Sequence, residues 1–351
     1  MTASVATRPA FRIGKASTVW RPRMVVANAG LLAAVLVLLC VNVGRGDFPI
    51  GVADVARILA GGGSQVEQFI VFDLRLPRSV VAVLVGAALG LSGAITQSIT
   101  RNPLASPDIL GITAGASSAA VAVIIFGGPV IAGAAIGLPF AAMAGGLLTA
   151  ALIYFLAWRG GIEGFRLILI GIAVNAILIA LTTWMLVLGD IWDVQRATVW
   201  LNGSLNGRDW GQVYPVGIAL ILLGAVLVVA GFQLGALKLG DETAAALGAR
   251  VQATQAVLLI ASVLLAAISV TAAGPIGFVA FVAPQVAMRV LGTAGPPLVG
   301  AALMGAALTL GSDVVARTAL PVELPVGIVT TAIGGPFLMY MVIRANRRAM
   351  R

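Results

Sequence analysis

Residues 75–117 read RLPRSVVAVLVGAALGLSGAITQSITRNPLASPDILGITAGAS, and this stretch decides the fold class. It holds no charged residue between Arg78 and Arg101. A helix of about 20 apolar residues is long enough to cross the ~30 Å hydrocarbon core of a bilayer. Small residues recur at four-residue spacing along this run, at Gly86, Gly90, Ala94 and Ser98. Such a stripe lets another helix approach closely. The stretch therefore predicts a membrane-spanning helix, Pro77–Ser98, packed within a bundle of helices.

The rest of the chain has the same character. Of its 351 residues 60% are hydrophobic and 10% are charged, and the mean hydropathy is +1.06. Soluble domains carry roughly 25% charged residues, so we expect an all-α, polytopic membrane protein with about ten transmembrane helices. The predicted spans are Met24–Gly44, Pro77–Ser98, Ile109–Gly127, Leu138–Ala157, Leu167–Leu188, Gln212–Phe232, Gln252–Ala273, Gly277–Leu291, Pro297–Ala316 and Val326–Ile343.

The distribution of Lys and Arg predicts the orientation. With a cytoplasmic N-terminus, the outer loops hold seven basic residues, and the other 15 of the 22 lie inside. The outer seven are Arg45, Arg57, Arg75, Arg78, Arg196, Arg208 and Arg317. Both termini are basic, so we expect both in the cytoplasm. The chain then divides into a basic arm (1–23), a transmembrane permease domain (24–345) and a basic tail (346–351). The first apolar run lacks a convincing cleavage site. We therefore expect a multi-pass protein of the bacterial cell (inner) membrane.

Several classes of function are disfavoured. The net charge of +9 comes from basic residues at the ends of apolar runs, so topology explains it better than nucleic-acid binding does. Cys40 is the single cysteine and histidine is absent, so we expect no disulfide within the chain, no metal site and no bare transition-metal ion as cargo. The sequence shows neither a nucleophile–base pair nor paired carboxylates, so nothing in it indicates an enzyme. The G-x-x-x-x-G-K-[ST] loop is absent as well. We expect no cofactor on this chain, and any ATP and Mg²⁺ would bind a separate ATPase.

Three motifs within residues 75–117 resemble the FecCD-type permeases, the membrane subunits of iron–siderophore and cobalamin ABC importers. They are R-x-P-R from Arg75, G-A-x-L-x-x-S-G-x-x-x-Q from Gly86, and N-P-L-A-x-P-x-x-L-G from Asn102. Three more follow in the family's order at residues 239–248, 274–284 and 313–327. The resemblance covers nearly all the chain beyond the arm. One departure is Gln285, where family members often have His.

The resemblance implies one permease of an ATP-driven importer that translocates an iron–siderophore complex by alternating access. Its expected partners are ABC ATPase subunits, a second permease and an external substrate-binding protein. A related second permease is expected rather than an identical copy. Outer arginines would dock the binding protein: Arg75, Arg78 and Arg317. The cytoplasmic gate would include Asn102, Pro103 and Leu104. The ATPase-coupling segment would be a short helix with Asp241 as its N-cap and Gly248 as its stop, and it comprises Leu239, Gly240, Asp241, Glu242, Ala245, Leu247 and Gly248.

Other interpretations stay open at the level of sequence. The cargo could be cobalamin or haem. An ion-coupled secondary carrier would need a carboxylate within a span, for which Asp313 is the nearest candidate. A membrane scaffold without transport activity is a further alternative. Arg78 could simply snorkel at the start of its helix, and the segment at 239–248 could be a plain connecting helix. Trp192, Trp200 and Trp210 lie in one outer segment, where they could anchor at the lipid headgroups or contact a partner.

Overall fold

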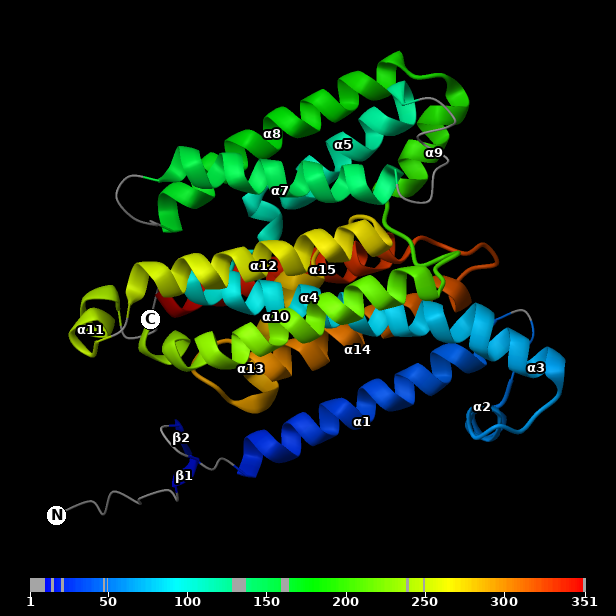
Figure 1. Ribbon diagram of the computed structural model, residues 1–351, viewed down its shortest axis with the longest axis horizontal. Coiled ribbons are helices and arrows are strands. Elements are labelled where there is room, and N and C mark those ends of the chain that lie inside the picture. Colours follow the sequence, from blue (N-terminus) through cyan, green and yellow to red (C-terminus); the bar gives the residue numbers. More distant parts are fainter. Residues whose placement is uncertain are drawn as a thin grey trace.

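A computed structural model describes residues 10–13, 16–19, 22–46, 48, 50–127, 137–158, 164–237, 240–248 and 250–349. It shows a bundle of long helices preceded by a short hairpin, in which β1 (Ala10–Ile13) pairs antiparallel with β2 (Ala16–Val19) (Figure 1). The fold class is thus all-α, as predicted. The hairpin lies within the basic arm, where no strand was expected.

Each predicted span coincides with a helix. These helices are α1 (Pro22–Gly44), α4 (Leu76–Ile99), α5 (Ile112–Phe126), α7 (Gly137–Ala157), α8 (Gly164–Leu188), α10 (Trp210–Leu237), α12 (Val251–Ala273), α13 (Val279–Leu291), α14 (Leu298–Thr318) and α15 (Val326–Ala349). Among the described residues eight of them are long and apolar enough to cross a membrane, while α5 and α13 are shorter. Ten crossings therefore stay a prediction. Helix α15 continues to Ala349, although the basic tail was expected to begin at residue 346.

Short elements connect these helices. They are α2 (Val52–Leu59), α3 (Gln65–Phe69), the π-helical η1 (Ile70–Arg75), the 3₁₀ turn η2 (Pro107–Leu110), α9 (Ile191–Leu201) and α11 (Asp241–Ala246). Figure 1 shows the start of α1, the end of α15 and α11 at one end of the bundle, called here the terminal end, and α2, α3 and α9 at the opposite end. The first and last long helices beginning and ending at the same end fit an even number of crossings. That the terminal end faces the cytoplasm stays a prediction.

Helix α4 lies at the centre of the bundle, and most of its residues are buried. A Cβ atom added to Gly86 would lie 2.4 Å from the carbonyl oxygen of Gly305, and one added to Gly90 would lie 2.1 Å from that of Ala301. Both carbonyls belong to α14, so the two helices touch backbone to backbone. The close packing expected from the small-residue stripe is confirmed.

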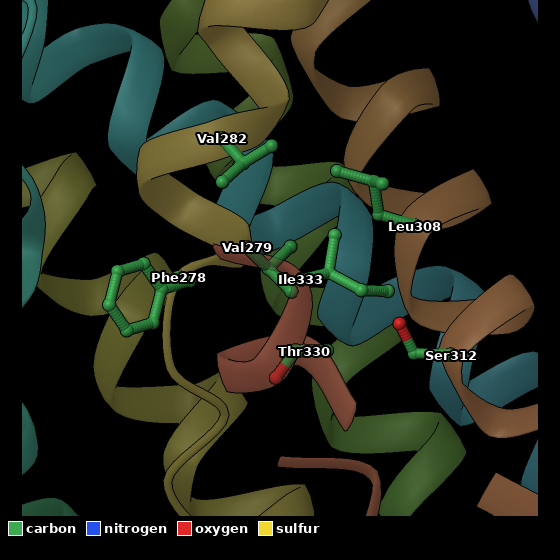
Figure 2. A pocket seen from close by; sticks show the side chains of 7 residues that line it. All are labelled: Phe278, Val279, Val282, Leu308, Ser312, Thr330 and Ile333. Carbon is green, nitrogen blue, oxygen red and sulfur yellow. The ribbon is translucent and has the colours of Figure 1, made fainter. Parts of the chain in front are cut away.

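A short non-helical connection separates α12 from α13. In it, Gly274 and Phe278 have φ angles of +72° and +65°. Figure 2 shows the first turn of α13 beside side chains of α14 and α15, around a small pocket. The cavity volume there is about 10 Å³, which is at most enough for a single water. This pocket therefore cannot hold a cargo molecule.

Gln285 on α13 occupies the position where the family often has His. Its Nε2 donates to Oε1 of Gln97 on α4 over 2.7 Å, and Nε2 of Gln97 donates to the carbonyl oxygen of Phe281 over 3.1 Å. Both glutamines are buried. Gln285 therefore works as a donor that fastens α13 to the central helix.

Candidate functional sites at the two ends of the bundle

Arg78 lies in the first turn of α4 at the opposite end, inside a network of charged groups. Its Nη2 donates to Oδ1 of Asp313 over 2.7 Å, and its Nη1 lies 2.6 Å from Oε1 of Glu323. The Arg78 side chain is 12% exposed and that of Asp313 is fully buried. Arg78 therefore does not snorkel towards solvent: its guanidinium is held by two carboxylates of the same chain.

Arg317, one turn after Asp313 on α14, joins the same network. Its Nη2 lies 3.3 Å from Oδ2 of Asp313 and donates to both oxygens of Asn42 at 2.8 Å. Asn42 in turn donates from Nδ2 to Asp313 over 2.9 Å. The Asp313 carboxylate thus holds three polar neighbours from α1, α4 and α14, and it joins these helices rather than facing a transport path. An ion-coupling role for Asp313 has no support in this geometry.

Arg75 ends η1 and hydrogen-bonds to the backbone at the end of α1 and just after it. It donates from Nη1 to the carbonyl oxygen of Val43 over 3.1 Å and from Nη2 to that of Phe48 over 2.7 Å. The structure therefore brings the three predicted docking arginines together at one end. Most of the hydrogen-bond donors of these arginines are occupied by groups of the same chain, so the side chains are held in place within it.

The predicted gate residues form a turn at the terminal end. Oδ1 of Asn102 accepts from the backbone N–H of Leu104 over 2.9 Å, and the backbone oxygen of Asn102 accepts from Ala105 over 3.1 Å. Pro103 is exposed, and Leu104 is 41% exposed. Arg101, with a φ of +49°, fastens this turn to the end of α10 by donating to the carbonyl oxygen of Leu237. The Asn102 side chain therefore shapes the turn, while Leu104 is the part presented outward.

The predicted coupling segment contains a helix, α11, at the terminal end. The N-cap is Gly240 and Asp241 is the first helical residue, so the N-cap prediction was wrong by one position. Gly248, with a φ of +85°, ends the turn as expected. Ala244 is fully buried against the bundle, whereas Leu247 is 67% exposed and Glu242 and Ala245 are also exposed. Leu239 lies outside the described residues. Helix α11 thus has one anchored face and one face open to a partner.

One acidic residue was missed by the sequence analysis. Asp108 in η2 borders a cavity of about 390 Å³ that extends along α5 and α8 past Asn175 and Thr182 to Pro275. Its Oδ1 accepts from the hydroxyl of Thr113 over 2.5 Å. Burial raises the pKa of the Asp108 carboxyl, against the opposing effect of hydrogen bonds from Thr113 and Ser106. The signal for it was present, since an aspartate directly precedes the predicted third span.

The family model described as the FecCD transport family matches residues 32–344. A ferric enterobactin transport system permease protein, FepG, from Escherichia coli is 40% identical over 93% of this chain and 100% of its own length. An achromobactin transport system permease protein, CbrC, from Dickeya dadantii is 41% identical over 89% of this chain and 90% of its own. The resemblance seen in the sequence thus extends along the whole permease domain.

A solved structure has the same fold. It is a metal-chelate type ABC transporter in an inward-facing conformation, and it aligns with a TM-score of 0.78 and 28% identity. The alignment covers 91% of this chain and 99% of that one. The arrangement of helices described above is therefore the arrangement of an ABC transporter permease.

Proposed function

The chain belongs to the FecCD transport family, and on this premise we propose that it is one membrane-spanning subunit of an ATP-driven importer for an iron–siderophore complex. The observation that carries the proposal is the full-length similarity to permeases for ferric enterobactin and achromobactin. The fold agrees with it, because the bundle resembles a metal-chelate type ABC transporter from end to end. The subunit itself is a permease and not an enzyme.

ATP hydrolysis would be supplied by a separate ATPase, since the sequence has no phosphate-binding loop. In this proposal the ATPase binds ATP and Mg²⁺ and contacts the exposed side of α11. Leu247 is the anchor that the geometry favours, because an apolar side chain that is 67% exposed at the terminal end gains most from being covered. A movement of α11 would be transmitted to the bundle through the packing contacts of the buried Ala244.

The transport path would pass the cavity between α5 and α8. Its wall is weakly polar, with hydroxyl and amide groups and the carboxyl group of Asp108. Such a wall suits a large cargo that must be released again rather than held. The turn at Asn102, Pro103 and Leu104 would narrow the exit of the path at the terminal end, and a second, related permease would complete the path.

The test is uptake in a bacterial strain that lacks this chain. Radioiron-labelled siderophores, with cobalamin and haem as controls, would be followed with and without the restored gene. Restored iron–siderophore uptake that stops when the ATPase is inactivated supports the proposal. Restored uptake of cobalamin or haem alone would reassign the cargo. Transport by the purified chain with an ion gradient and no ATPase would overturn the importer mechanism.

Docking of the binding protein needs a substitution that leaves the ion network intact. Arg75→Gln changes a donor to backbone carbonyls, while Arg78 and Arg317 keep Asp313 paired. We expect weaker association of the binding protein and a smaller effect at high salt, since charge pairs across an interface mainly aid encounter. Unchanged association at low salt would remove Arg75 from the docking surface. Arg57→Gln, an exposed arginine already paired with Asp54, is the matched control.

A further inference from the structure

A second basic site lies at the opposite end, apart from the ion network. A cavity of about 680 Å³ opens between α9, the end of α5, the start of α7 and the loop that follows α9. This volume is within the range of small-molecule sites. Its walls carry two arginines and two indoles besides amide and aliphatic groups: Arg196, Arg208, Trp192 and Trp200.

Arg208 is the arginine of this cavity that forms no ion pair among the described residues. Its Nε donates to the carbonyl oxygen of Ser204 over 3.3 Å, and within the described part of the chain the guanidinium forms no ion pair. The side chain is half-buried. Burial lowers the pKa of the Arg208 guanidinium, and the charge of Asp209 opposes this only in part. A guanidinium stays protonated nonetheless, so a partly dehydrated positive charge faces the cavity.

The other groups narrow the chemistry of the guest. Arg196 also lines the cavity, but it is paired with Asp193 one turn earlier in α9. Trp192 is 72% exposed beside it. The unpaired cation Arg208 disfavours a positively charged guest, and two indoles offer flat faces on which aromatic rings can stack. A guest that satisfies both features is anionic and carries aromatic rings.

The loop that carries Arg208 is held in place by the bundle. The N–H of Ser204 donates to the carbonyl oxygen of Ala273 at the end of α12 over 2.8 Å, and the oxygen of Gly203 accepts from Gly327 at the start of α15 over 3.2 Å. Gly203 has a φ of +62°, and a Cβ there would lie 2.1 Å from the carbonyl oxygen of Pro275. The guanidinium is thus positioned before any ligand arrives, which lowers the entropic cost of binding.

We propose that the cavity bounded by Arg208, Arg196, Trp192 and Trp200 binds an anionic, aromatic iron chelate, which makes a ferric catecholate the class of cargo. Arg208 faces the negative charge of the iron-bound catecholate oxygens, and the indoles cover the rings. Neutral hydroxamate chelates would gain nothing from the cation, and citrate-type chelates would gain nothing from the indoles. The proposal rests on the importer function above and specifies its substrate.

The test measures initial uptake of a radioiron-labelled ferric tris-catecholate at a subsaturating concentration in the deletion strain. A ferric tris-hydroxamate is measured in parallel. Arg208→Gln is expected to lower catecholate uptake about tenfold, because a charge-assisted contact is lost. Arg208→Lys should recover part of it, and Trp192→Ala should lower it severalfold. Arg57→Gln, which changes an exposed and already paired arginine at the same end, should leave it unchanged.

The outcomes separate the two proposals. No uptake of either iron chelate with the wild-type chain overturns the iron–siderophore cargo on which this site rests. Uptake of the hydroxamate but not of the catecholate keeps the importer function and overturns the catecholate site. Equal losses for both chelates in Arg208→Gln would also overturn it, since the residue would then support structure or lipid contact. Binding is read separately by quenching of tryptophan fluorescence, using the assembled transporter in lipid nanodiscs. Quenching by the ferric catecholate that Trp192→Phe reduces supports the site, and quenching equal in both proteins contradicts it.

Discussion

Arg78 and Arg208 lie at the same end of the bundle, but they are in opposite situations. Arg78 is 12% exposed and contacts two carboxylates, one of them fully buried. Arg208 is half-buried, borders a large cavity and has a backbone carbonyl as its hydrogen-bond partner. Removing the partner of a guanidinium that is paired in a buried place destabilises the fold, whereas a guanidinium without an ion pair can bind an external anion. The motif marks the first of these arginines, and only the structure distinguishes the second.

The largest expected effect comes from removing the acid at the centre of the ion network. Asp313→Ala would leave Arg78 and Arg317 buried beside each other, and breaking a buried pair costs about 3–5 kcal/mol. The thermal unfolding midpoint of the purified protein in detergent measures this loss. Asp73→Ala, at an exposed carboxylate of the same end, is the control and should unfold as the wild type does. Equal midpoints for the two variants would show that the network adds no stability.

The same substitution at Arg78 and Arg208 should change the free energy of unfolding by different amounts. Arg78→Gln should cost about 1.5–3 kcal/mol, because hydrogen bonds to charged groups are lost in a buried place. Arg208→Gln should change stability by less than about 0.5 kcal/mol, since no ion pair is broken. Unfolding midpoints compare the two directly. A loss in Arg208→Gln as large as that in Arg78→Gln would mean that Arg208 serves the fold, and the distinction drawn above would fail.

A smaller effect is expected at the rim of the network. Glu323 is 39% exposed, so water and salt screen its pair with Arg78. Glu323→Gln should therefore cost about 0–1 kcal/mol, and the difference from wild type should shrink when unfolding is measured at high salt. A loss that is large or independent of salt would show that Glu323 belongs to the buried part of the network.

A modest difference is expected between two tryptophans of the outer segment. Trp210 donates from Nε1 to the carbonyl oxygen of Phe72 over 3.2 Å, whereas Trp192 is 72% exposed. Trp210→Phe should cost about 0.5–1.5 kcal/mol through the lost hydrogen bond, and Trp192→Phe should cost less than about 0.5 kcal/mol. Unfolding midpoints of the two variants would show the difference. The reverse order would mean that Trp192 is a structural anchor and not part of an open site.

The helices were predictable because each is a long apolar run bounded by basic, Gly or Pro residues, and those signals are local. The small-residue face of α4 was equally readable, since Gly86 and Gly90 lie one turn apart and meet α14. The pairing of Arg78 with Asp313 was not predictable, because the two residues are 235 positions apart. For the same reason, Arg78 was predicted to dock the binding protein, with snorkelling at a helix start as the alternative, and Asp313 was named only as the nearest candidate for ion coupling in the carrier alternative.

Three properties of this chain can be read without its structure: that it lies in a membrane, where its helices run and which family it resembles. These properties follow from composition, local periodicity and the order of motifs. Tertiary structure alone decided which charges are balanced and which are not. That outcome depends on residues of distant helices meeting at one depth, as Asn42, Arg78 and Arg317 do around Asp313, while Arg208 faces a cavity and forms no ion pair among the described residues. Whether an arginine supports the fold or awaits a ligand is settled by its neighbours in space.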